Sequence, residues 1–181
     1  MPDTERLITA EELERFPEDD WRYELAEGRL IRMSPAGYVH GRVTMRVGFL
    51  LEQHVRTHNL GVVQNEVGFK LASNPDTVRA PDIAFIRRDR IPSTDPKGFW
   101  NGPPDVAVEV LSPDDTPTEI RKKAVEYLTR GASIVLVIDP GSKTATTFTD
   151  GTSTTIAGAD EELSLSPVVA GFRCRVRDIF E

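Results

Sequence analysis

The middle of the chain predicts a strand, a helix and a second strand in direct succession. Residues 105–111 form a Val-rich run that a single charge, Glu109, interrupts, which is typical of a central strand covered on both faces. Residues 116–119, Thr-Pro-Thr-Glu, combine a capping box with proline at the first helical position, and Gly131 marks the helix end. Residues 133–138 form a second apolar strand. This unit predicts a right-handed parallel crossover and therefore an α/β fold.

The N-terminal third predicts a short helix, a hairpin and a long helix. Residues 9–12, Thr-Ala-Glu-Glu, have the form of a capping box, and Pro17 closes the helix that they open. Residues 22–33 are predicted as two strands joined at a Glu-Gly turn. Apolar residues recur at helical spacing over residues 38–58, and Gly61 stands where a C-terminal cap is expected.

The remaining segments predict further strands. Residues 62–71 and 78–86 are each predicted as one strand, and the turn-forming run Ser-Asn-Pro-Asp between them indicates that they pair. After the second buried strand, threonine-rich strands are predicted to about residue 156, and residues 176–180 predict a short closing helix.

Length and composition fit one globular domain over residues 1–181. The hydrophobic share is 39% and the charged share is 28%, so the core needs neither a disulfide nor a structural metal. The longest uninterrupted apolar run, residues 134–138, is far too short to cross a bilayer, and the start lacks the features of a secretory signal. Cys174 is the only cysteine, which argues against disulfide and cysteine-zinc chemistry. We expect a cytoplasmic protein without membrane contact.

The net charge of −7 argues against a general nucleic-acid binder, whose affinity comes mainly from lysine and arginine bound to phosphates. Residues 1–30 contain ten acidic and four basic residues, so the 19 acids and 18 bases of the rest nearly balance. A near-neutral body can carry local basic surfaces, although such groups usually form only a solvated face. The candidates are Arg42 with Arg46, Arg87 with Arg88 and Arg90, and Arg173 with Arg175 and Arg177.

Two acidic residues lie inside predicted strands. Strand alternation places Asp82 on one face with Ala84, and Glu109 on one face with Ala107, so the two carboxylates can converge. Burial of an uncompensated carboxylate is costly, so Glu109 implies a cation, a hydrogen-bond network or a raised pKa. A hard divalent cation would take two carboxylates and a backbone carbonyl as part of its shell. A buried ion pair with an arginine is an equally good explanation of Glu109.

Helical phase distinguishes the two lysines of the helix that follows. Lys122 lies nearly opposite the apolar stripe, whereas Lys123 lies at its edge and can point toward the sheet. An ammonium there could neutralise charge on a scissile phosphate or position the attacking water. The alternative is a surface lysine whose stem covers apolar side chains. The stripe consists of Ile120, Ala124, Tyr127 and Leu128.

Four segments resemble the Uma-type restriction-endonuclease-like proteins, a branch of the PD-(D/E)XK nuclease superfamily. The similarity runs from the Tyr-Glu-Leu-Ala-Glu-Gly-Arg-Leu segment near the start to Pro-Val-Val-Ala-Gly-Phe near the end, and so covers nearly the whole chain. As a set, these motifs are specific. The four segments are residues 79–86 (RAPDIAFI), 103–113 (PPDVAVEVLSP), 123–128 (KAVEYL) and 131–140 (GASIVLVIDP).

This resemblance implies a restriction-endonuclease-like core, an α+β mixed sheet flanked by helices, in which Asp82 and Glu109 bind magnesium or manganese. The common superfamily pattern places a lysine two residues after the second acid, where this sequence has Leu111. The family's arrangement moves that lysine to the following helix, at the position of Lys123. Such relocation also occurs in members whose activity has not been shown, so the resemblance supports the fold more strongly than the activity.

Two further residues match the family pattern. Glu24 corresponds to the acid at the start of the pattern and would reach the metal through water, or else is an exposed hairpin glutamate. His40 corresponds to a recurrent histidine near the start of the long helix. It would contact substrate phosphate, or else has only a packing role at the helix end.

The leading hypothesis is a magnesium- or manganese-dependent endonuclease that hydrolyses phosphodiester bonds in DNA. Asp82 and Glu109 hold the metal, which activates water, and Lys123 stabilises the developing charge. The acidic charge and Leu111 favour the alternative of a non-catalytic nucleic-acid- or protein-binding domain that retains the fold. A carboxylate-based hydrolase of a small molecule is a third alternative. Nucleases that cut both strands often form homodimers, so the sequence leaves monomer and homodimer open.

Overall fold

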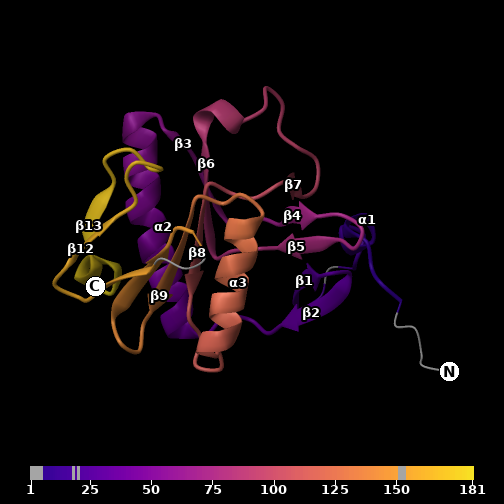
Figure 1. The fold of residues 1–181 in the computed structure, drawn as a ribbon, viewed down its shortest axis with the longest axis horizontal. Helices are drawn as coiled ribbons and strands as arrows, with labels where there is room; N and C mark the ends of the chain where they lie inside the picture. Colours follow the sequence, from indigo (N-terminus) through magenta and orange to yellow (C-terminus); the bar gives the residue numbers. More distant parts are fainter. Residues whose placement is uncertain (1–5, 18, 20, 151–153) are drawn as a thin grey trace.

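The structure is a computed structural model that describes residues 6–17, 19, 21–150 and 154–181. Within these residues the strands form a six-stranded, a five-stranded and a two-stranded sheet (Figure 1). The six-stranded sheet has the order β11 (Thr154–Ala157), β10 (Thr144–Phe148), β9 (Ile134–Asp139), β8 (Val106–Val110), β6 (Ile83–Arg87) and β3 (Gly61–Asn65). The five-stranded sheet has the order β2 (Arg29–Met33), β1 (Arg22–Ala26), β5 (Thr77–Arg79), β4 (Phe69–Ala72) and β7 (Trp100–Asn101).

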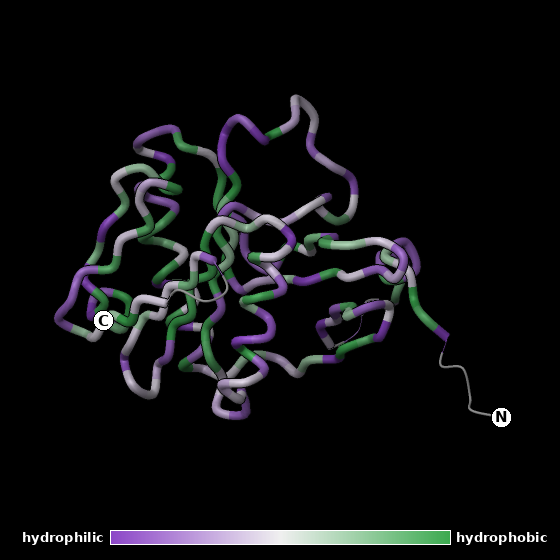
Figure 2. Tube along the Cα trace, in the orientation of Figure 1, coloured by the Kyte–Doolittle hydropathy of each residue, from purple (hydrophilic) through white to green (hydrophobic). Residues whose placement is uncertain are grey.

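Two helices, α2 (Tyr38–His58) and α3 (Pro117–Thr129), cover opposite faces of the six-stranded sheet. Because strand residues alternate between faces, Val108 packs toward α2 while Ala107 packs toward α3. Figure 2 shows hydrophobic residues concentrated along the central strands and hydrophilic residues in many of the loops. The central strands are therefore buried on both sides.

The predicted strand, helix and strand around Glu109 are present. β8 and β9 pair in parallel, with Glu109 beside Val137, and α3 connects the two strands. Thr116 Oγ1 accepts a hydrogen bond from the N–H of Glu119, and Gly131 has a φ of 108° just after the helix. The capping and glycine signals therefore identified the boundaries of α3.

The two strands predicted for residues 62–71 and 78–86 are each divided between two sheets, which corrects the prediction. β3 pairs with β6 in the six-stranded sheet, and β4 pairs with β5 in the five-stranded sheet. A Cβ on Gly68 would lie 2.3 Å from the Phe99 ring, so only glycine fits the first crossing between sheets. The second crossing contains Pro81, which has no N–H for a sheet ladder. Asp82 follows it and lies before β6, outside the strand to which it was assigned.

The long helix spans residues 38–58 as predicted, but a different residue ends it. Asn59 takes the left-handed conformation at φ 57° and ψ 40°, and its N–H bonds back to the last turn. Gly61 begins β3, where a Cβ would lie 2.0 Å from the carbonyl oxygen of Ile86. The glycine is therefore required by close strand packing, and the cap prediction at Gly61 is wrong.

The predicted N-terminal elements are confirmed with one shift. β1 and β2 form the hairpin, and Glu27 and Gly28 have φ values of 51° and 77°, as a tight hairpin turn requires. α1 (Ala10–Leu13) begins with the predicted capping box at Thr9, but it ends before Pro17 rather than at it.

The C-terminal prediction is confirmed except for two short strands. β10 and β11 are the threonine-rich strands, and the closing helix is a 3-10 turn, η2 (Val176–Ile179). β12 (Glu162–Ser164) and β13 (Arg173–Arg175) were not predicted, because three residues carry too little periodic signal. No helix among the described residues has the length and apolar character needed to span a membrane.

Asp76 holds the first helix against the turn between β4 and β5. Its Oδ2 accepts the N–H of Ala10 at 2.7 Å and lies 3.2 Å from Nζ of Lys70. Burial alone would raise the pKa of Asp76, but the Ala10 N–H and the Lys70 ammonium together lower it below its usual value. The ionised carboxylate is therefore the form that the fold favours.

We predict that Asp76→Ala lowers the free energy of unfolding by about 2 kcal/mol at pH 7, because it removes a charge-assisted hydrogen bond. The folded-state pKa is depressed, so this contribution is fully present above the unfolded pKa of about 4 and is lost as the pH falls through the folded pKa. Urea unfolding of both proteins at neutral and acidic pH measures the difference. A difference that stays constant on acidification contradicts the assignment.

Candidate active site

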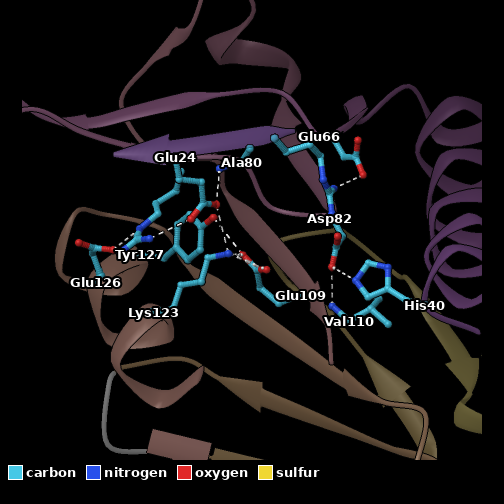
Figure 3. Close-up of polar contacts among 12 residues, drawn as sticks. Glu24, His40, Glu66, Ala80, Asp82, Glu109, Val110, Lys123, Glu126 and Tyr127 are labelled. Atoms are coloured by element: carbon cyan, nitrogen blue, oxygen red, sulfur yellow. Dashed lines mark hydrogen bonds and ion pairs between the residues drawn. The ribbon is translucent and has the colours of Figure 1, made fainter. Parts of the chain in front are cut away.

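Asp82 and Glu109 lie at the same end of two paired strands. β6 and β8 are antiparallel with Ile83 beside Val108, so the two acids are the next residues beyond this pair. Oδ2 of Asp82 accepts the backbone N–H of Val110 at 2.7 Å, which holds the Asp82 carboxylate against the strand that carries Glu109 (Figure 3). The two acids therefore converge as predicted, although Asp82 lies in the crossing segment rather than in the strand.

Glu109 is 8% exposed and is surrounded by donors from α3. Nζ of Lys123 lies 2.9 Å from each carboxylate oxygen, and the Tyr127 hydroxyl donates to Oε1 at 3.1 Å. Burial, with contributions from the Asp82 and Glu24 carboxylates, raises the pKa of Glu109 to about 7 in spite of the Lys123 ammonium. Glu109 thus has a buried ion pair, but its partner is a lysine rather than an arginine.

Lys123 points toward the sheet, as helical phase predicted. Its side chain is 20% exposed and its ammonium lies between Glu109 and Oε1 of Glu24, the latter at 3.3 Å. Burial alone would lower the pKa of Lys123, but the two carboxylates raise it above its usual value. Lys122, one residue earlier in the helix, is exposed. The alternative of a surface lysine at position 123 is therefore wrong.

Glu24 comes from the hairpin strand β1 and is only 2% exposed, so the alternative of an exposed hairpin glutamate is wrong. Its oxygens accept from Nη1 of Arg79 at 2.8 Å and from the N–H of Ala80 at 3.0 Å. Burial alone would raise the pKa of Glu24, but Lys123 and Arg79 lower it below its usual value. Glu24 is therefore an ionised group that contacts Lys123.

His40 lies in the first turn of α2 and approaches Asp82 from the side opposite to Lys123 (Figure 3). Its Nε2 is 3.2 Å from Oδ2 of Asp82, and its Nδ1 is 3.4 Å from the hydroxyl of Thr44. The bond to Asp82 raises the pKa of His40 above its usual value, in spite of burial. His40 therefore orients an acid of the site and does more than pack at the helix end.

The comparisons with known proteins identify the family of the chain. The sequence matches the Uma2 family, described as "Putative restriction endonuclease", over residues 10–177. The chain belongs to the Uma2 family. This confirms the resemblance stated from the sequence motifs, and it indicates a nuclease of the restriction-endonuclease type.

The fold of this Uma2 protein is similar to the crystal structure of a "putative nuclease belonging to DUF820" from Anabaena variabilis. The TM-score is 0.81 at 22% sequence identity, and the match covers 96% of this chain and 97% of that chain. The likeness confirms the predicted restriction-endonuclease-like core. A search of the curated proteins found no match.

Three further residues of the Uma2 site were not predicted. Nε of Arg79 donates to Glu126 at 2.6 Å, so Arg79 joins Glu24 on β1 to α3. Tyr127 was assigned only to the apolar stripe, yet its hydroxyl contacts Glu109. Arg79 and Glu126 lie within motifs that carry the family resemblance. The periodicity of the sequence does not indicate which residue either of them contacts.

The arginines named as basic-surface candidates largely contact the chain itself. Arg87 and Arg90 both pair with Asp105, at 3.0 and 2.9 Å. Arg42 and Arg46 donate to backbone carbonyls of the C-terminal segment. Ion pairs or backbone bonds also involve Arg88 with Asn59, Arg173 with Glu162 and Arg177 with Asp160. Most of these groups therefore support the fold.

Two carboxylates of the site, Asp82 and Glu109, are donors that would fit a divalent cation. Among the described residues no group of three or more His, Cys, Asp or Glu side chains has the geometry of a metal site. Magnesium, however, is commonly bound through one or two carboxylates, with waters and substrate phosphate completing its shell. Asp82 Oδ1 accepts no hydrogen bond from the described residues, so it is free to coordinate. Burial is the main cause of the raised pKa of Glu109, and a cation at its carboxylate would oppose that effect.

We predict that Arg79→Met lowers the free energy of unfolding by about 3 kcal/mol, because it leaves the buried Glu24 with one cationic partner fewer. Arg22→Met is the matched control, since Arg22 on β1 pairs with Glu66 near the surface and should cost less than about 1 kcal/mol. Urea unfolding of the three proteins measures both effects. Equal losses in the two variants contradict the importance given to Arg79.

Proposed function

We propose that this protein is a divalent-metal-dependent endonuclease that hydrolyses DNA phosphodiester bonds. The observation that carries the proposal is the convergence of Asp82, Glu109 and Lys123 at one end of β6 and β8, within a family of the restriction-endonuclease type. Two carboxylates can hold a metal that assists phosphodiester hydrolysis, and a lysine beside them can stabilise the charge that develops on the phosphate. Site chemistry, rather than the fold alone, supports the reaction.

Each residue of the site has a separate part in this proposal. Asp82 and Glu109 would hold magnesium or manganese, which supplies Lewis-acid polarisation and an activated water. Lys123 supplies a fixed positive charge beside the reacting phosphate, where negative charge develops. His40 keeps the Asp82 carboxylate in place, and Glu24 keeps the Lys123 ammonium in place.

Lys123 and a bound cation would compete for the same carboxylate. Lys123 contacts both oxygens of Glu109, and an ammonium has three donors, one of which faces Glu24. If the Glu109 carboxylate bound a metal cation, the N–H donors of Lys123 that contact Glu109 would become available to a phosphate oxygen of the substrate. Lys123 would therefore neutralise Glu109 in the metal-free protein and the substrate phosphate when a metal is bound.

A second function is nucleic-acid or protein binding without catalysis, and one specific observation favours its protein-binding form. Most arginines named as basic-surface candidates bind acids or carbonyls of the chain itself. The surface therefore has fewer free cations than the sequence suggests. Metal binding and cleavage distinguish the two functions, because a binding domain requires neither Asp82 nor Glu109 as a ligand.

We predict that manganese binding weakens about tenfold or more in Asp82→Ala and in Glu109→Ala, because each variant removes a coordinating oxygen. Calorimetric titration measures the affinity, and a rise in the unfolding temperature with added manganese measures it independently of activity. Asparagine at position 82 and glutamine at position 109 keep the shape of each side chain, so these variants should reduce binding more than folding. Unchanged affinity in both alanine variants refutes the metal site.

We also predict that Lys123→Met reduces the single-turnover cleavage rate about a hundredfold or more, because it removes a charge that stabilises the transition state. Metal binding should persist. Lys122→Met, one residue away on the exposed side of α3, is the matched control and should cleave like the wild type.

The buried ion pair makes Lys123→Met less stable than the control, so thermal unfolding is followed and rates are compared where all proteins are folded. Equal cleavage by the wild type and Lys123→Met refutes the role of Lys123. If the folded wild type cuts no DNA with either metal, the binding function replaces the catalytic one.

A further inference from the structure

A cavity of about 840 Å³ lies beside the candidate site. Its wall includes His40, which contacts Asp82, and Leu111, which lies two residues after Glu109. The rest of the wall comes from the first turns of α2 and α3, the segment between β8 and α3, and β9 and β10 with the turn between them. This volume is typical of a site for a small molecule or a single group of a larger one. A nucleotide next to a phosphate held at Asp82 and Glu109 would therefore lie at this cavity.

The wall of the cavity is mainly apolar and includes an exposed aromatic ring. Tyr38 is 85% exposed at the start of α2, while Phe148 is buried in the wall. Ser112 and Thr146 add hydroxyl groups that can donate and accept hydrogen bonds. An exposed ring beside a phosphodiester site offers a surface on which a nucleobase can stack.

The charges of the wall are unfavourable for a duplex. Among the described residues that form it, Asp115 and Asp139 are acidic and Arg121 is the permanent cation. Duplex DNA carries a charge about every 1.7 Å of its axis, and its binding relies on lysine and arginine at the phosphates. The candidate arginines elsewhere largely contact the chain itself, as described above. The acidic groups of this wall repel a row of phosphates but do not repel a neutral base.

We propose that the substrate is nucleic acid with unpaired nucleotides, and that the base next to the scissile phosphate occupies this cavity against Tyr38. The proposal rests on the proposed function, because it names the form of substrate that the same site accepts. A base in a duplex is stacked and paired, so it reaches the cavity only after leaving the helix, at a cost in free energy. An unpaired base avoids that cost.

The test measures binding by fluorescence anisotropy with calcium in place of magnesium or manganese. Calcium is a hard cation that takes oxygen ligands, so the site holds a cation while binding is measured separately from cleavage with the other two metals. The probes are fluorescein-labelled single strands of DNA and of RNA and a DNA duplex of the same sequence. We expect single strands to bind about tenfold or more tightly than the duplex, and Tyr38→Ala to lose about tenfold on single strands. The DNA and RNA probes distinguish the two sources of unpaired bases.

Phe49→Ala is the matched control, because Phe49 is another exposed aromatic residue of α2, at 54%, and lies outside the wall of this cavity. It should bind like the wild type. Tyr38→Phe keeps the ring and should retain most of the affinity, and thermal unfolding checks that all variants are folded.

Equal or tighter binding of the duplex overturns the proposal, as does unchanged single-strand binding by Tyr38→Ala. Absence of binding to every probe also overturns it, while the manganese titration decides the metal site separately. Binding through Tyr38 without cleavage by either metal supports the cavity as the base site and refutes the endonuclease function.

Discussion

The buried carboxylate of Glu109 is the constraint around which this structure is arranged. β8 lies between two other strands and beneath a helix on each face, so Glu109 cannot rely on bulk water to balance its charge. Lys123 on α3 forms ion pairs with Glu109 and with Glu24 of the hairpin. Arg79 binds Glu24 and also pairs with Glu126 on α3. One series of alternating charges therefore joins the two larger sheets and α3.

Four consecutive residues, 79–82, link the five-stranded sheet to the six-stranded sheet and hold the Glu24 and Asp82 carboxylates in place. Arg79 and the N–H of Ala80 bind Glu24 on the five-stranded sheet, whereas Asp82 binds the N–H of Val110 on the six-stranded sheet. Pro81 interrupts sheet pairing between them. The crossing therefore holds Asp82 beside β8 by hydrogen bonds rather than by strand register, which explains how a residue outside the strand still meets Glu109.

Local and periodic features of this fold could be predicted from the sequence, and long-range partners could not. The capping signals of α3 and the phase of Lys123 act within one helix, so the predicted orientation is confirmed. The division of residues 78–86 between the five-stranded and the six-stranded sheet was missed, because the alternation of apolar residues along a strand does not indicate where the chain passes from one sheet to another. Tyr127 was assigned to the apolar stripe from its helical spacing, and only the fold shows that its hydroxyl meets Glu109. Arg79 gave no periodic signal, since its partners lie far away in the sequence.

The balance of charge connects the candidate site to its substrate. Glu24, Asp82, Glu109 and Glu126 supply four carboxylates, and Arg79 and Lys123 supply two permanent cations. A site with this excess of negative charge repels phosphate unless a further cation is present, so the proposed reaction requires the cation before the nucleic acid. Because most of the arginines named as basic-surface candidates contact the chain itself, phosphate contacts alone would add little affinity. Recognition then depends on contacts with neutral parts of the substrate, and bases are the neutral parts that only an unpaired strand exposes fully.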